Sequence, residues 1–133
     1  MKICITSTGP DLNSMIDPRF GRCQYFIITD EKGKLIESIK NTGVRASGGA
    51  GITAAQIIAN EKIDVIITGN IGPNAFSVLS GSNIKIYSGI LNLTIKDAVK
   101  KFNQGELKET TTPTVGGHFG GGPGASRGRR GGF

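Results

Sequence analysis

The residues with the greatest potential for chemistry lie in three glycine-containing loops. Residues 17–23 read DPRFGRC and contribute Arg19 and Arg22, whose guanidinium groups are always charged and can bind an anion through two parallel hydrogen bonds. Residues 43–53 (GVRASGGAGIT) and 69–74 (GNIGPN) each lead into a predicted helix, where free backbone N–H groups and the helix dipole favour negative charge. Each loop alone is equally well explained as a tight turn that needs glycine, but together they predict a pocket for an anionic ligand. The candidate ligand-binding residues are Arg19, Phe20, Gly21, Arg22, Arg45, Gly49, Gly51, Thr53, Asn70 and Gly72.

The soft side chains of the sequence, Cys4, Cys23 and His118, are widely separated and show no zinc-type spacing. Cys4 stands between two isoleucines and is expected to be a small core residue. Cys23 follows Arg22, and a neighbouring cation would lower the pKa of its thiol; the alternative is an ordinary residue at a strand edge. His118 belongs to a glycine-rich segment, where a general base cannot be held at hydrogen-bonding distance.

The apolar pattern predicts the elements that position these loops. Residues 2–7 and 63–68 are short apolar runs typical of strands that are buried on both faces. Thr94 is expected to begin the last helix, with Asp97 three residues later as in a capping box, and Gly105 to end it. The expected strands are 2–7, 23–30, 34–40, 63–68 and 84–87, and the expected helices are 51–61, 73–80 and 94–105.

This order of elements predicts an α/β fold. Strands 2–7, 63–68 and 84–87 should be parallel and joined by right-handed crossovers, and strand 23–30 should run antiparallel to its neighbours. The expected architecture has three layers, with a ribonuclease-H-like mixed sheet, one antiparallel strand and about three helices. The three loops then lie at the carboxyl ends of strands, where ligands bind in such sheets.

A nuclease with this fold would need clustered carboxylates to hold two metal ions. The first strand contains no acidic residue, and Asp11 and Asp17 lie in the loop that follows it. Asp17 precedes a proline and is as easily explained as a turn residue. We therefore expect a binding protein and not an enzyme.

The composition divides the chain into two parts. It has 133 residues, 21 glycines and a formal net charge of +6, and nine of the 18 residues from Gly116 to Phe133 are glycine. We expect an α/β domain over 1–112 and a flexible Gly/Arg-rich tail over 113–133. The chain lacks a long apolar stretch and has only two cysteines, so we expect a cytoplasmic monomer that does not enter a membrane.

The tail supports an alternative function. Residues 127–133 read RGRRGGF, an RGG-like pattern that can follow a nucleic-acid backbone. Three arginines release few counterions, so such binding would be weak and sensitive to salt. Nucleic-acid binding is therefore the second hypothesis.

Four segments of residues 1–108 resemble the dinitrogenase iron–molybdenum cofactor biosynthesis family. They are 17–22 (DPRFGR), 48–51 (GGAG), 66–75 (IITGNIGPNA) and 98–107 (AVKKFNQGEL). The resemblance implies a ribonuclease-H-like fold and a small accessory protein that binds or carries an iron–sulfur or molybdenum-containing cluster precursor. It also implies donor and acceptor proteins for that cluster, and a related member type holds a molybdenum–copper sulfide cluster largely without covalent ligands.

The resemblance transfers only in part to the site residues. Several members have a histidine before Phe-Gly-Arg that can ligate the cluster, whereas this sequence has Arg19, which favours recognition by charge. Cys23 is a candidate replacement as a soft thiolate ligand. His118 is a candidate ligand if the tail folds over the pocket, and the alternative is a solvated tail. Whether the isolated protein is apo stays open.

Overall fold

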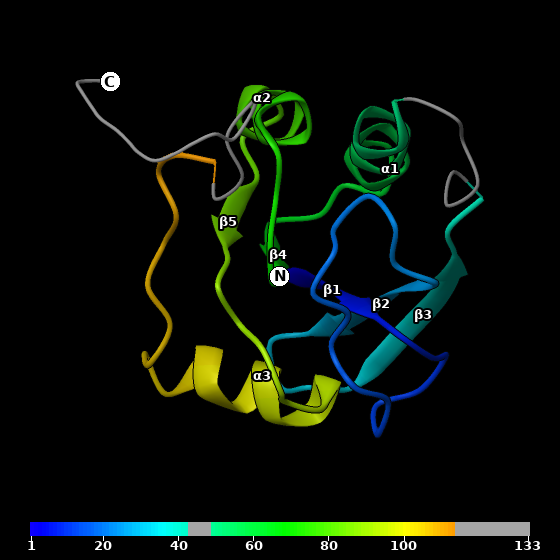
Figure 1. The fold of residues 1–133 in the computed structure, drawn as a ribbon. Coiled ribbons are helices and arrows are strands. Elements are labelled where there is room, and N and C mark those ends of the chain that lie inside the picture. The colour runs from blue at the N-terminus through cyan, green and yellow to red at the C-terminus, as the bar shows by residue number, and fades with distance from the viewer. Residues whose placement is uncertain (43–48, 114–133) are drawn as a thin grey trace.

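The computed structural model describes residues 1–42 and 49–113, which form a five-stranded mixed sheet and three helices (Figure 1). The elements follow the predicted order along the chain. They are β1 (Lys2–Ser7), β2 (Tyr25–Asp30), β3 (Leu35–Lys40), α1 (Ala50–Ala59), β4 (Val65–Ile67), α2 (Pro73–Gly81), β5 (Lys85–Tyr87) and α3 (Ile95–Asn103).

The strands are arranged in the order β3-β2-β1-β4-β5. Strands β1, β4 and β5 are parallel, and β2 pairs antiparallel with both β1 and β3. One strand therefore runs against the other four, which confirms that expectation and the α/β class. The more specific likeness to a ribonuclease-H sheet stays a prediction.

The helices cover both faces of the sheet, with α1 and α2 on one face and α3 on the other (Figure 1). Strand β1 shows how the sequence produces three layers, because successive side chains of a strand point to opposite faces. Cys4 packs into the core beneath α1 and α2, whereas Ile3 and Ile5 pack into the core beneath α3. All three side chains are fully buried, so the role of Cys4 as a small core residue is confirmed.

The ends of the helices show which boundaries the local sequence signals predicted. Thr94 is the N-cap of α3, and its hydroxyl accepts a hydrogen bond from Asp97 N at 3.2 Å, as the capping pattern predicts. Gly105 has a φ of 73° and follows the end of α3. For α2 the predicted end is wrong, because Gly81 is the last helical residue and the left-handed residue is Asn83.

The buried face of α1 is formed by Ala50, Ala54, Ala55 and Ile58, whereas Ile52 and Ala59 are partly exposed. The reason is that α1 packs against α2 as well as the sheet: a Cβ on Gly51 would lie 3.5 Å from the Cβ of Ala75. The first turns of α1 and α2 therefore pack against each other through small residues.

The segment after α3 returns along the outer edge of β5. Thr110 N donates to Ile86 O at 2.7 Å, and Ser88 N donates to the Thr110 hydroxyl at 2.9 Å. These bonds occupy part of an otherwise open sheet edge, which would invite pairing with another chain. Within residues 1–42 and 49–113, no helix has the length and apolar character needed to cross a membrane.

Candidate functional site

The first and third glycine-containing loops are joined through their backbones. Phe20 N donates to Asn70 O at 3.1 Å, and Asn70 N donates to Pro18 O at 2.7 Å. Gly69 allows this approach, because a Cβ at its position would lie 2.5 Å from the Cα of Pro18. The loop after β1 is therefore fixed to the loop between β4 and α2.

The first loop also lies against the start of α1. A Cβ on Gly21 would lie 2.8 Å from the backbone N of Gly51, so only glycine fits there without movement. Asn41, which is buried, holds the loop from the other side: its Nδ2 donates to Gly21 O at 3.1 Å and to Cys23 O at 2.9 Å. Nothing in the sequence distinguished Asn41, because its role depends on contacts that are distant along the chain.

A cavity of about 220 Å³ opens where these segments meet. We call it the loop cavity. The described residues that line it are Phe20, Gly21, Gly49, Ala50, Gly51, Ile52, Asn70, Gly72, Pro73, Asn74 and Ala75.

Two helix N-termini form most of its wall. The N-caps of α1 and α2 are Gly49 and Gly72, and neither has a side chain that could cap the helix. The first N–H groups of a helix have no acceptor within it, so those of Gly51, Ile52 and Asn74 are available to a ligand. Two helix dipoles thus place positive potential on one cavity, which suits an anion.

The cavity brings together six of the predicted ligand-binding residues. Arg19, Arg22 and Thr53 are not among the described residues that line it, and Arg45 and His118 lie outside the described residues. Five lining residues were not among the predicted ligand-binding residues, and the available signal was their place in the first turn of a helix that follows a glycine-containing loop. They are Ala50, Ile52, Pro73, Asn74 and Ala75. The predicted ligand-binding residues that line the cavity are Phe20, Gly21, Gly49, Gly51, Asn70 and Gly72, and their binding role stays a prediction.

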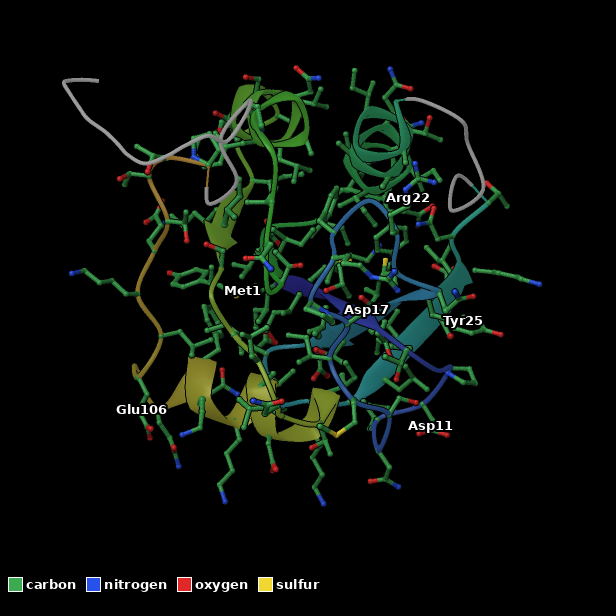
Figure 2. The ribbon with its side chains drawn as sticks, viewed as in Figure 1. Met1, Asp11, Asp17, Arg22, Tyr25 and Glu106 are labelled. Atoms are coloured by element: carbon green, nitrogen blue, oxygen red, sulfur yellow. The ribbon has the colours of Figure 1, made fainter. Side chains whose placement is uncertain are left out.

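Arg19 is oriented by Asp17, whose side chain is only 2% exposed. The Asp17 carboxylate accepts hydrogen bonds from Arg19 N at 3.0 Å, from Nε at 3.3 Å and from Nη2 at 3.4 Å. The Arg19 side chain is 61% exposed, and Arg19 immediately precedes Phe20, which lines the cavity. Figure 2 shows Asp17 and Arg22 in the same loop, with Arg22 on the side of α1.

Cys23 lies in the core and not on a strand edge, and it does not line the cavity. Its Sγ donates to Phe20 O at 3.3 Å. Burial, with a smaller contribution from the Asp17 charge, raises the pKa of the Cys23 thiol to about 12. The expectation of a lowered pKa is wrong, because burial disfavours the charged thiolate and the Asp17 carboxylate disfavours it further. A thiolate ligand at Cys23 stays a prediction that requires this thiol to leave the core.

The donor set of the cavity indicates what it can hold. Within the described ranges, no three or more His, Cys, Asp or Glu side chains gather in a way that could bind a metal ion. The described residues that line the cavity are glycines, apolar residues and two asparagines, and none of them carries a charged side chain. Such a site fits a preformed anion that is held by hydrogen bonds and dipoles, without covalent ligands from these residues.

The fold and the cavity define a small α/β protein with a cavity at two neighbouring helix N-termini. The chain belongs to the family described as dinitrogenase iron-molybdenum cofactor, whose model matches residues 1–105. This confirms the family resemblance noted in the sequence.

Three relatives illustrate the relationship. The apo form of the orange protein from Desulfovibrio gigas is 36% identical, with a TM-score of 0.82 over 85% of this chain and 95% of that chain. A Thermotoga protein described as a candidate NifB protein is 34% identical, with a TM-score of 0.73 over 85% of this chain and 96% of its own. An uncharacterized protein of Methanocaldococcus jannaschii is 38% identical over 82% of this chain and 91% of its own length.

Proposed function

We propose that the protein binds and carries an anionic metal–sulfur cluster as cargo, either an iron–sulfur cluster or a molybdenum-containing sulfide. It passes the cargo between donor and acceptor proteins in the cytoplasm and catalyses no reaction of its own. Family membership and the likeness to the orange protein support a role connected with clusters. The observation that carries the proposal is the loop cavity, where two uncapped helix N-termini meet.

The cavity favours cargo over a resident cofactor. Hydrogen bonds from backbone N–H groups can be made and released without breaking covalent metal–ligand bonds, as transfer to an acceptor requires. Sulfide-bridged clusters carry negative charge at their sulfur atoms, which are the atoms that these N–H groups would contact. The exposed guanidinium group of Arg19, in the loop after β1, adds positive charge that attracts such an anion as it approaches.

The proposal is tested by anaerobic loading of the full chain. The protein is incubated separately with ferrous iron plus sulfide and with tetrathiomolybdate, then desalted and analysed by absorption spectroscopy and by metal and sulfide content. Retention of one of these species in a stoichiometric amount is expected. A colourless protein that retains neither species contradicts the proposal.

A substitution at Gly72 tests the location. A Cβ at Gly72 meets nothing within 4 Å, and its extended φ of −81° suits any N-cap residue. In Gly72→Asp, a carboxylate would occupy the N–H groups of α2 and repel an anion, while the helix would be at least as stable. We expect cargo affinity to fall by about tenfold or more.

Two matched variants control this test. Gly72→Asn has nearly the same shape without the charge and should weaken binding less. Thr94→Asp adds the same charge at the N-cap of α3, on the opposite face of the sheet, and should leave binding unchanged. Equal losses in Gly72→Asp and Thr94→Asp would show a general charge effect and would contradict binding in the loop cavity.

A further inference from the structure

A second cavity of about 570 Å³ lies on the opposite face of the sheet, along α3. We call it the α3 groove. One wall is α3, and the other is formed by the turn between β2 and β3 and by the loop after β1. Its lining residues are Leu12, Asn13, Lys32, Gly33, Lys96, Val99, Lys100, Asn103 and Gln104.

The floor of the groove is formed by apolar side chains that are packed in or against the core. Val99 is 2% exposed and belongs to the core beneath α3, and Leu12 packs against that core. Gly33 has a φ of 87°, and a Cβ at its position would lie 3.7 Å from Cγ1 of Val99, so the turn lies directly against α3. The floor of the groove is therefore formed by residues that belong to the folded core or pack against it.

The rim of the groove carries only positive charge. Lys32, Lys96 and Lys100 line it and are exposed, and no acidic residue lines it. Across the described part of the chain, none of the three ammonium groups forms a salt bridge. Of the acids nearby, the carboxylate of Asp30 accepts hydrogen bonds from the backbone N–H groups of Lys32 and Lys34, and Asp97 lines a neighbouring cavity.

We infer that the α3 groove binds an acidic, amphipathic segment of a partner protein. One or two apolar side chains of that segment would cover Leu12 and the aliphatic parts of the lysine side chains, and flanking carboxylates would pair with the ammonium groups. The lining of α3 extends from Lys96 to Gln104, about 12 Å at 1.5 Å per residue, which is the length of two helical turns.

The dispersed charge favours a polypeptide over a small anion. A single exposed ion pair contributes little to binding, so a ligand needs several such pairs together with apolar contact. A nucleic acid is disfavoured because no aromatic or arginine side chain lines the groove among the described residues, and bases would have nothing on which to stack.

This inference does not depend on the proposed cargo. The sheet separates the α3 groove from the loop cavity, so a partner bound along α3 would leave the loop cavity open. The structure thus combines one site for an anion with one for an acidic protein surface.

Nuclear magnetic resonance of the full chain, labelled with nitrogen-15, tests the inference. The probe is a synthetic helical peptide of about 14 residues, with leucines at i, i+3 and i+4 spacing and glutamates beside them. Addition of the peptide should shift the amide signals of Lys32, Gly33, Lys96 and Lys100. The affinity should decrease as salt is added, because exposed charges are screened. A peptide with lysine in place of each glutamate should not bind.

Charge reversal supplies the matched control. The double variant Lys96→Glu with Lys100→Glu should lower the peptide affinity by about tenfold or more. The pair Lys40→Glu with Lys85→Glu makes the same change of net charge on exposed positions of β3 and β5 and retains the basic tail, so its affinity should change by less than about twofold.

Three results would overturn the inference. The first is equal weakening by both double variants, which would assign binding to net charge or to the tail. The second is absence of shifts at the groove up to millimolar peptide. The third is tighter binding of an oligouridine at the same amides, which would make the groove a nucleic-acid surface.

Discussion

Gly21 and Gly51 lie so close together that a Cβ on Gly21 would be 2.8 Å from the backbone N of Gly51. This contact joins the loop after β1 to the first turn of α1, and both residues line the loop cavity. Two segments that are 30 positions apart in the chain therefore form one wall.

We expect Gly21→Ala to disrupt this wall. The added methyl group meets backbone atoms that cannot move independently, so the free energy of unfolding should fall by about 1–3 kcal/mol, with loss of cargo binding. Gly81→Ala is the matched control, because its Cβ meets nothing within 4 Å and it lies in α2. Urea unfolding should show that Gly81→Ala is neutral or stabilising. If Gly21→Ala is as stable as this control, the close contact is not maintained in solution.

Substitution of Arg19 tests whether its charge contributes to cargo binding, because affinity and stability are measured separately. Its pair with Asp17 is exposed on the arginine side, so Arg19→Ala should lower the free energy of unfolding by no more than about 1 kcal/mol. Affinity for the anionic cargo should fall several-fold, and Arg19→Lys should retain most of it. Unchanged affinity in Arg19→Ala would remove this residue from the site, and a large loss of stability would make it structural.

The buried thiols predict a loss of stability at high pH. Burial raises the pKa of Cys23 from 9.0 to about 12 and also raises that of Cys4. The unfolded thiols therefore lose their protons first, so this stabilisation is complete below pH 9 and falls between pH 9 and about 12.

The loss should approach about 1.4 kcal/mol per pH unit for each thiol. Urea unfolding at about pH 8 and about pH 10.5 measures this slope, and Cys23→Ala should have a shallower one. The comparison uses the slope of each variant, so the cavity left by the smaller side chain does not affect it. Equal slopes for the two proteins would show that ionisation of Cys23 is not the cause.

An apolar residue in place of Thr29 should make the folded protein more stable. Thr29 is fully buried in β2, and its Oγ1 has no hydrogen-bond partner among the residues that the structure describes. Thr29→Val preserves the shape and removes the unsatisfied hydroxyl, so the free energy of unfolding should rise by about 1 kcal/mol. Thr6→Val, which removes a hydroxyl bonded to Asp17 O and Thr68, should have the opposite effect. A decrease in both variants would reveal a partner for Thr29 in solution.

Local patterns were sufficient for most of the fold. The apolar run at β1 matched its strand at both ends, and the Thr94 cap began α3 at the predicted residue. Strand β2 began two residues later than predicted, at Tyr25, and the carbonyl of Cys23 before it accepts a hydrogen bond from the Asn41 side chain. This hydrogen bond comes from a distant side chain, which no local pattern contains.

The sequence by itself determined the α/β alternation, the family and the three glycine-containing loops, because each is encoded by residues that are close together in the chain. Only the tertiary structure decided which residues line the loop cavity. Packing turned the Arg19 side chain toward Asp17 and buried Cys23, where desolvation raises the pKa of its thiol. The α3 groove likewise depends on the fold, since Lys32 and Lys96 are brought to one rim only when the turn after β2 packs against α3.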